Sequence, residues 1–477
     1  MLPSMFNVRV PLDSVAGRDE VFLMNTFTDA QLIVSHEVVS LLDRLERDGE
    51  AAAELPEHRA ALSTLAEHGF VVPDRGSERR KLEQYFHDLR ESPAELRVTV
   101  LTTLQCNFAC DYCFQGDHGD YNKFAAKMSL ETAARVAEWT ESRLDAIGSE
   151  RLVLTFFGGE PLLNMPVVYY LAERLWQACQ ARGVRLLVNV ITNGLLLTPA
   201  MIDRLNAVGL NGVKITLDGD RDTHNRMRPL RGGQGTFDRI IANVRQIAGR
   251  CRITIGGNFD ETSVDSYPAL LDFLEEQEFA GQLARVAFKP VIREPKPAQP
   301  KGIIPLTAVG LEGKPLNGTC MTSAGGGTSI CDNCNFLDEK MSFLRDETKK
   351  RGFSTVDGVH MGPCEIHRRH AYTIGPEGSL YACPGFTGDS TQATGHISAP
   401  SSPRHLECTA RFDVLAPWRN CGDCAFIPVC GGGCSVAAHT EQQDMNQPNC
   451  HKASFEAGVV SLARDAAAAE TRETAAV

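Results

Sequence analysis

Three cysteines lie close together in the segment LQCNFACDYCFQ: Cys106, Cys110 and Cys113. Their Cys-x3-Cys-x2-Cys spacing follows directly on a β-rich apolar run at residues 97–103, so we expect them in a loop at the end of a strand. Three thiolates at this spacing are able to converge on one metal centre. An iron–sulfur cluster usually has four cysteine ligands, so a three-cysteine site leaves one iron open to a cofactor or substrate. The alternative is a set of buried or zinc-binding thiols.

This spacing after a first strand, followed by the aromatic Phe114, resembles the radical S-adenosylmethionine (SAM) enzymes. The resemblance implies a 4Fe–4S cluster on Cys106, Cys110 and Cys113, which are then the predicted catalytic centre. It also implies that the open iron chelates the amino and carboxylate groups of SAM. Reduction then cleaves SAM to methionine and a 5′-deoxyadenosyl radical, and the cofactor carries this chemistry.

The segment Gly158-Gly159-Glu160 ends the next apolar run and resembles the family motif for the cofactor amino group. Glycine lets the backbone approach a ligand closely, and a carboxylate accepts hydrogen bonds from an ammonium. Asn193, in Thr192-Asn193-Gly194 at the end of the third run, matches the position on the ribose side of the cofactor. The alternative for each motif is an ordinary turn.

The segment HNRMRPLRGGQGTFD (residues 224–238) follows a fourth run that ends at Leu217-Asp218-Gly219. It resembles the corresponding segment of sulfatase maturases and peptide maturases. The resemblance implies that Arg228 pairs with the cofactor carboxylate through a charge-assisted contact. Arg231 is a second candidate for this role, and a solvated surface charge is the alternative for both.

Seven further cysteines and Gly378 follow a second spaced pattern, which resembles the SPASM extension of radical SAM enzymes. The resemblance implies two auxiliary iron–sulfur clusters, expected to be 4Fe–4S. A lone Cys-x2-Cys pair is also typical of a zinc knuckle. The ligands implied for one cluster are Cys421, Cys424, Cys430 and Cys450, and those for part of the other are Cys364, Cys383 and Cys434.

Two four-ligand clusters need one ligand more than these seven. Sulfatase maturases have an eighth cysteine six residues after the first, where this chain has His370. The iron near Cys364 is therefore open, and able to bind a substrate thiolate, or closed by His367, His370 or Cys408. Histidine ligation would raise the potential of the cluster. The alternative is that both histidines are surface residues.

The remaining cysteines divide into two kinds. Cys179 and Cys251 lie in apolar patterns and are expected to be packing residues. Cys320, Cys331 and Cys334 lie in a Gly-rich stretch, where they are candidates, with Cys408, for a further metal site, a redox pair or extra cluster ligands.

Six alternations of strand and helix at residues 96–290 predict an α/β fold with parallel strands. Six units are too few for the eight-stranded barrel, so we expect a partial (β/α)6 TIM-like barrel with its functional groups at the carboxyl ends of the strands. Residues 1–75 read strand–strand–helix–helix–strand and resemble a winged-helix, PqqD-like recognition domain for leader peptides. Beyond these, the expected divisions are a linker at 76–95, a bridging segment at 291–363, the SPASM domain at 364–455 and a tail at 456–477.

The charge balance limits the partners. With 48 basic and 60 acidic side chains, the net charge is −12, which argues against nucleic acid or an anionic membrane as the main partner. No apolar run approaches the ~20 residues of a spanning helix, and the amino-terminal residues lack a signal-peptide pattern. We therefore expect a cytoplasmic protein, in a reducing compartment where sixteen cysteines are metal ligands or packing residues.

These observations favour an oxidoreductase that matures a ribosomally made precursor peptide by installing a thioether or carbon–carbon crosslink. A flavodoxin or ferredoxin-type protein would supply electrons. The alternatives are a formylglycine-generating sulfatase maturase, a peptide epimerase and a non-catalytic electron-transfer protein. Sulfatase maturases place a basic Asp directly after the second SPASM cysteine, where this chain has Pro384. Asp389 is a substitute candidate for that base.

Overall fold

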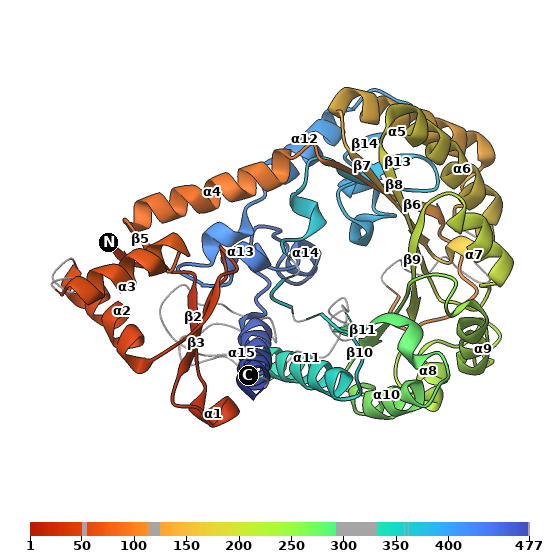
Figure 1. The fold of residues 1–477 in the computed structure, drawn as a ribbon. Coiled ribbons are helices and arrows are strands. Elements are labelled where there is room, and N and C mark those ends of the chain that lie inside the picture. The colour runs from red at the N-terminus through yellow and green to blue at the C-terminus, as the bar shows by residue number, and fades with distance from the viewer. Residues whose placement is uncertain (50–54, 114–124, 292–331, 357, 361, 476–477) are drawn as a thin grey trace, which may run out of the picture.

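The computed structural model describes residues 1–49, 55–113, 125–291, 332–356, 358–360 and 362–475 (Figure 1). Two of the possible extra metal ligands, Cys320 and Cys331, lie outside these residues, and the side chain of Cys334 is not described. The predictions made for these three cysteines therefore fall outside the described residues.

Six parallel strands form the centre of the fold, and each pairs with the next one along the chain. They are β6 (Glu95–Thr103), β7 (Arg151–Gly158), β8 (Arg185–Thr192), β9 (Leu210–Thr216), β10 (Ile253–Phe259) and β11 (Leu283–Pro290). The intervening helices are α5 (Leu130–Ile147), α6 (Met165–Arg182), α7 (Pro199–Asn206), α8 (Arg221–Met227), α9 (Phe237–Ile247) and α10 (Tyr267–Glu275). The six predicted strand–helix alternations are confirmed.

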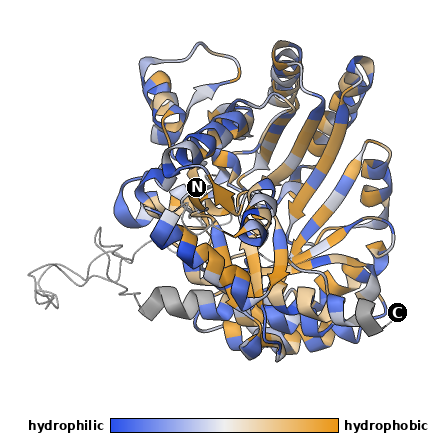
Figure 2. Cartoon of the chain, turned by 60° about the vertical axis from the view of Figure 1, so that its left-hand side comes forward, coloured by the Kyte–Doolittle hydropathy of each residue, from blue (hydrophilic) through white to orange (hydrophobic). Residues whose placement is uncertain are grey.

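The side chains of these strands alternate between two environments, as a period of two requires. In β8, Leu186, Val188 and Val190 are buried in the main hydrophobic core under the helices. Leu187 and Asn189 point to the other side, the inner face of the sheet, where they are half-buried. Figure 2 shows the same alternation as orange and blue bands along the strands. The helices therefore cover one face only, and the inner face is open to another part of the chain.

The carboxyl-terminal segment extends the central sheet. Strand β12 (Ala371–Ile374) pairs in parallel with β6, and β13 (Ser379–Tyr381) and β14 (Gly395–His396) follow it as antiparallel strands. The result is a mixed sheet of nine strands. The sequence pattern predicted that the segment from Cys364 onward is a separate unit. In the structure, its strand β12 pairs with the first barrel strand, β6.

Helices complete the carboxyl-terminal part: α11 (Asp332–Lys350), α12 (Pro403–Asp413), α13 (Ile427–Cys430), α14 (Ser435–Gln442) and α15 (Lys452–Ala475). Helix α11, which the sequence pattern did not indicate, packs against β11 and α15. In Figure 1, α13 and α14 lie on the opposite side of the central sheet from α5 and α6. The inner face of the sheet is therefore turned toward the cysteine-rich segment.

The amino-terminal part holds two small sheets. The strands β2 (Asn7–Pro11), β3 (Val21–Asn25) and β4 (Gln31–Val34) form an antiparallel sheet, while β1 (Leu2–Pro3) pairs with β5 (Val71–Val72). Its helices are α1 (Asp13–Ala16), α2 (His36–Asp48), α3 (Pro56–Glu67) and α4 (Arg75–Glu91). Leu23 packs toward α2 and α3, and Phe22 packs with residues of α15. Strand β4 was not anticipated, and the winged-helix-like identity of this part stays a prediction.

Among the described helices, none combines the length and the apolar character that crossing a bilayer would require.

Candidate active site

The end of β7 lies directly against the loop that carries Cys106. Backbone hydrogen bonds run from Gly159 N to Thr103 O (2.9 Å) and from Glu160 N to Gln105 O (2.8 Å). A Cβ on Gly159 would lie 2.2 Å from Gln105 O, and a Cβ on Gly158 would lie 2.3 Å from Thr103 O. The sequence analysis assigned these glycines to close approach of a ligand. The structure shows that they permit close approach of the protein's own cysteine loop.

The Glu160 carboxylate connects the ends of β7 and β8. It is fully buried and accepts hydrogen bonds from Leu162 N (3.0 Å), Thr192 Oγ1 (2.7 Å) and Asn193 N (2.8 Å). Burial raises the pKa of Glu160, and these three donors work against that shift. Glu160 therefore fixes the strand ends around the cysteine loop, and its contact with a cofactor ammonium stays a prediction.

Asn193 holds the loop from the β8 side. Its side-chain amide donates to Asn107 Oδ1 (2.7 Å), and its oxygen accepts from Leu195 N (3.0 Å). Asn193 is buried. The structure thus brings this predicted ribose-side residue next to the neighbour of Cys106.

The two candidate arginines have different roles. Arg231 Nε donates to the backbone oxygen of Cys106 (2.9 Å), so it holds the cysteine loop. Arg228 is buried, its Nη1 donates to the Tyr112 hydroxyl (2.6 Å), and its guanidinium lies 5.5 Å from the centre of the Phe108 ring. Within the described residues the buried Arg228 Nε has no hydrogen-bond partner. An orphaned guanidinium N–H next to the cysteines suits a carboxylate, which fits the role that the resemblance implied for Arg228.

A polar network that no sequence motif indicated holds the Arg228 side chain in place. Tyr112 donates to the buried Asp218 carboxylate, which also accepts from Asn258 N (2.7 Å). Arg228 Nη1 lies 3.5 Å from Asp218 Oδ2. The sequence pattern indicated only that Asp218 lies at the end of a strand. Its pairing with Tyr112 joins residues that are far apart in the chain, so no local signal identified it.

His224 is also part of this polar network. Its Nδ1 accepts from Asp218 N (3.1 Å), and its Nε2 contacts Thr236 Oγ1 (3.0 Å), which in turn donates to Arg228 O (2.9 Å). Burial lowers the pKa of His224 well below its ordinary value. A neutral imidazole therefore connects the backbone of Asp218 with that of Arg228.

The three cysteines of the loop lie near one another and near Arg228. Burial, together with the charges on Glu160 and Cys110, raises the pKa of the Cys106 thiol to about 12. Burial also raises the pKa of Cys110, whereas the charge of Arg228 lowers it and that of Cys113 raises it. A buried thiol of this kind becomes a thiolate when a metal binds it. The donor set is therefore suited to an iron–sulfur cluster.

The seven remaining predicted ligands separate into two groups in space. Besides burial, the pKa of Cys421 is raised by charges on Cys430, Cys424 and Cys450. In the same way, the pKa of Cys383 is raised by charges on Cys364 and Cys434. These neighbours coincide with the two ligand sets that the sequence resemblance implied, and their role as cluster ligands stays a prediction.

The spacing of the thiols bears on the kind of metal centre that they could hold. Among the described residues, no three His, Cys, Asp or Glu side chains converge as the ligands of one metal ion do. In a 4Fe–4S cluster each cysteine binds a different iron, so its thiolates surround the cluster and do not meet at one point.

The candidates for an eighth cluster ligand differ in their surroundings. His367 is 1% exposed, and neither ring nitrogen has a hydrogen-bond partner among the described residues. Its Nε2 would lie 3.3 Å from a Cβ on Gly431, which stands between Cys430 and Cys434. His370 is less enclosed and lies near Arg143 and Glu91.

Cys408 has a different environment from the two histidines. Its Sγ accepts from Arg411 (3.3 Å) within an apolar cluster. The Cys408 sulfur already has a partner, whereas both ring nitrogens of His367 and Nδ1 of His370 have none among the described residues. His367 is the more deeply buried of the two histidines, so it is the better candidate for a ligand.

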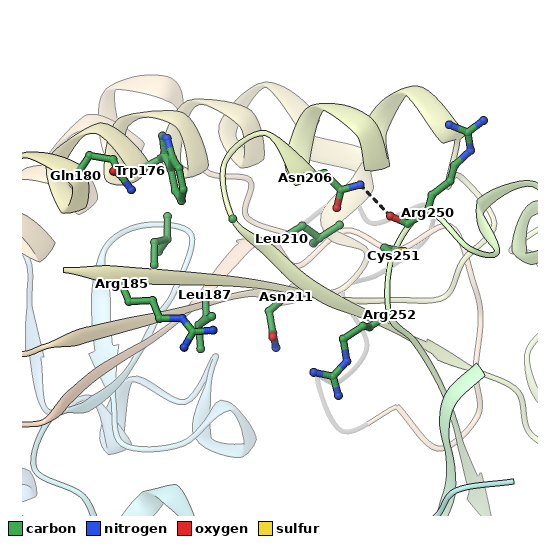
Figure 3. A pocket seen from close by; sticks show the side chains of 12 residues that line it. Trp176, Gln180, Arg185, Leu187, Asn206, Leu210, Asn211, Arg250, Cys251 and Arg252 are labelled. Atoms are coloured by element: carbon green, nitrogen blue, oxygen red, sulfur yellow. Dashed lines mark hydrogen bonds between the residues drawn. The ribbon is translucent and has the colours of Figure 1, made fainter. Parts of the chain in front are cut away.

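A pocket of about 520 Å³ lies at the opposite edge of the sheet (Figure 3). It is lined by Arg185 at the start of β8, Leu210 at the start of β9, Trp176 of α6 and Cys251. Functional groups of parallel α/β folds lie at the carboxyl ends of the strands, so this pocket is not part of the candidate site. Cys179 lies in the main core and Cys251 packs against it, and burial raises the pKa of each to about 11.

Comparison with known proteins identifies the central part of the chain. Residues 100–262, which include the loop and strand ends described above, match the Radical SAM superfamily. These residues form a radical SAM domain. A radical SAM domain implies SAM and a 4Fe–4S cluster as cofactors, in agreement with the sequence resemblance.

Curated relatives share this domain at moderate identity. Fe-coproporphyrin III synthase of Methanosarcina barkeri is 28% identical over 43% of this chain and 46% of its own length. PqqA peptide cyclase of Ruegeria pomeroyi is 32% identical over 33% of this chain and 38% of its own length. The chain thus spans less than half of the length of each of these relatives.

The fold extends beyond the radical SAM domain. The structure of anSMEcpe with bound AdoMet resembles 78% of this chain and 99% of that chain, with a TM-score of 0.56 and 16% identity. A second anSMEcpe structure, with AdoMet and the Cp18Cys peptide, has a TM-score of 0.54 and 15% identity. At this identity the likeness shows a common fold.

Proposed function

We propose that this protein is a radical SAM maturase that oxidatively modifies a ribosomally made precursor peptide. The observation that carries the proposal is the loop of Cys106, Cys110 and Cys113, held against the strand ends and facing the orphaned Nε of Arg228. Bound there, the cluster and SAM would supply a radical that abstracts hydrogen from an unactivated C–H bond.

The chain's own residues would position the cofactor. Arg228 would bind the SAM carboxylate, with Tyr112 and Asp218 holding its guanidinium in place. Glu160 and Asn193 fix the strand ends, and Glu160 would accept hydrogen bonds from the SAM ammonium. The buried surroundings of these residues exclude water, which limits side reactions of a radical.

The two other cysteine sets support the oxidative part of the proposal. The set of Cys364, Cys383 and Cys434 and the set of Cys421, Cys424, Cys430 and Cys450 would hold auxiliary clusters. Such clusters accept the electron that remains on a substrate after hydrogen abstraction, or bind the substrate. A peptide crosslink of the thioether or carbon–carbon type is a net oxidation and therefore needs such an electron acceptor.

The amino-terminal part is proposed to recognise a leader peptide. Strand β4 pairs with β3 on one side, and its other edge has no partner strand among the described residues. Leu32, Ile33 and Val34 of β4 are half-buried. An unpaired strand edge next to apolar side chains accepts an extended peptide by strand addition. The PqqA peptide cyclase relative acts on a peptide, as its name states.

A sulfatase maturase is the second candidate, since the anSMEcpe fold covers most of the chain. Pro384 supplies no base after Cys383, and the Asp389 carboxylate accepts from Thr391 N (2.8 Å) to begin a short 3-10 turn. This hydrogen bond favours a structural role for Asp389. We therefore prefer the peptide maturase over the sulfatase maturase as the proposed function.

Anaerobic reconstitution with iron, sulfide, dithionite and SAM tests the proposal. We expect 5′-deoxyadenosine and about twelve irons per chain, four for each of three clusters. Cys106→Ala should abolish 5′-deoxyadenosine formation. Absence of this product from the wild-type protein would contradict the enzyme assignment and favour an electron-transfer protein.

The substrate is tested by co-expression with a peptide encoded beside this gene, followed by mass spectrometry. A loss of two mass units indicates a crosslink, and a gain of one in heavy water indicates epimerisation. Removal of residues 1–75 should weaken leader binding while SAM cleavage without substrate persists. Unchanged leader affinity would reject the recognition role.

A further inference from the structure

The inner face of the central sheet is basic, although the chain as a whole has a net charge of −12. By strand alternation, the inward positions of β6–β11 include one carboxylate, Glu95, which is paired with Arg97 (2.5 Å) and Arg151 (2.6 Å) at the amino end of the sheet. Further cations at inward positions are Arg185, Lys214, Arg285 and Lys289. This face is therefore suited to an anion.

Three of these cations lie together on neighbouring strands. Lys214 is on β9, and Arg285 and Lys289 are on β11, with β10 between them. None of the three has an ion pair or hydrogen bond among the described residues through its side chain. Although solvent reaches Lys214, burial and the charges of Lys289 and Arg285 lower its pKa to about 8. Arg285 and Lys289 are exposed as well, so water screens part of the repulsion among the three cations, and an anionic ligand is able to reach all of them.

The strand between them makes room for Lys214. Gly256 on β10 lies beside Ala287 of β11, and a Cβ on Gly256 would lie 2.7 Å from Lys214 Cε. The absence of a side chain at Gly256 lets the Lys214 stem cross β10 toward β11. The position of the ammonium is therefore built into the sheet.

Strand register places the basic group near the radical site. Lys289 pairs in register with Asn258, whose amide donates to the Tyr112 hydroxyl (3.2 Å) beside Arg228. A group bound by Lys289 would thus lie beside the radical site.

We propose that Lys214, Arg285 and Lys289 bind a carboxylate of the substrate, so that the peptide carries an Asp or Glu close to its modified residue. The inference rests on the proposed peptide-maturase function and adds the substrate's charge class. Three cations around one carboxylate give charge-assisted hydrogen bonds, which are stronger than neutral ones. They would also position the neighbouring residue for hydrogen abstraction.

The charge of an auxiliary cluster held by Cys383 is a competing explanation for Lys289, because the two side chains are close enough to interact electrostatically. It does not account for Lys214, whose pKa responds to Lys289 and Arg285. The two explanations predict different results for substitutions at Lys214 and Lys289, which the experiment uses.

The test measures binding of a hexaglutamate peptide and of its hexaglutamine counterpart to the reconstituted holoprotein at low salt. Calorimetry gives the affinity for the wild type and for Lys214→Met, Arg285→Met and Lys289→Met. Lys81→Met, an exposed lysine of α4, is the matched control. We expect hexaglutamate to bind better than hexaglutamine, and each inner-face variant to lose about tenfold or more in affinity. The control should keep the wild-type affinity.

Three results would overturn the inference: equal binding of the two peptides, equal losses in Lys81→Met and Lys214→Met, or tighter binding of inorganic tripolyphosphate than of hexaglutamate. The last would indicate a phosphorylated ligand. A Lys289→Met variant that shifts the potential of an auxiliary cluster but keeps hexaglutamate affinity would remove Lys289 from the site and contradict the three-cation arrangement. Peptide binding is measured without turnover, so failure of the radical chemistry would appear separately, as absence of 5′-deoxyadenosine.

Discussion

Replacing Gly159 with alanine tests whether the strand end positions the cysteine loop. The added Cβ would lie 2.2 Å from Gln105 O, 2.6 Å from Gln105 C and 2.6 Å from Leu104 O. Real contacts of this kind begin near 3.0 Å, so the two backbones must separate by at least 0.8 Å. Gly159 does not have a positive φ, so alanine is compatible with the backbone conformation and the whole effect is steric.

The neighbours that receive the new methyl group cannot rotate away, because they are backbone atoms. Gln105 O accepts from Glu160 N (2.8 Å), and Leu104 N donates to Ala126 O (2.8 Å). Overpacking of this kind costs about 1–3 kcal/mol of stability. The shift passes to Cys106, the next residue, and a displacement near 1 Å at a reacting centre lowers a rate by about 100-fold.

The assay compares Gly159→Ala with Gly281→Ala, whose Cβ meets nothing within 4 Å. Urea denaturation gives the free energy of unfolding, and chromatography gives the rate of 5′-deoxyadenosine formation at equal iron content. We expect Gly159→Ala alone to lose about 2 kcal/mol and about 100-fold in rate. If both variants keep wild-type stability and rate, the close approach does not position the loop and the reasoning is wrong.

Three further predictions concern single side chains. Arg228→Lys keeps the charge but removes the orphaned Nε, so equilibrium binding of SAM should weaken about tenfold or more; unchanged affinity would exclude Arg228 as the carboxylate ligand. Burial holds His224 neutral, so the unfolded chain takes up a proton that the folded chain does not, and stability falls as pH drops below about 6.5, by at most about 2 kcal/mol at pH 5. His224→Gln should remove that part of the slope in denaturant unfolding, and an identical slope would reject the assignment. If His367 is the eighth cluster ligand, pulsed EPR of the reduced protein should detect a nitrogen hyperfine coupling of an auxiliary cluster. His367→Ala should abolish this coupling, and His370→Ala should leave it unchanged. Loss of the coupling in both variants, or in neither, would contradict the assignment of His367 as the ligand.

The strands and helices of the central part could be predicted because their signal is local. Apolar runs of period two recur six times between residues 96 and 290, and five amphipathic stretches of period 3.6 lie between them. The short helix α8 was not predicted. Strand β4 and helix α11 escaped prediction. The residues of β4 continue an apolar helical pattern, and tertiary pairing with β3 decides their conformation.

The sequence by itself determined which residue types are available for chemistry and at what spacing. The Cys-x3-Cys-x2-Cys loop, the Gly-Gly-Glu strand end and the seven later cysteines are local patterns, and they sufficed to indicate a radical SAM domain. Only the tertiary structure decided which of these groups meet. It gave Arg228 and Arg231 different hydrogen-bond partners and paired Tyr112 with Asp218. It also placed three cations on the inner face of the sheet. Such contacts join residues that are far apart in the chain. Local sequence patterns do not show which of these residues come together when the chain folds.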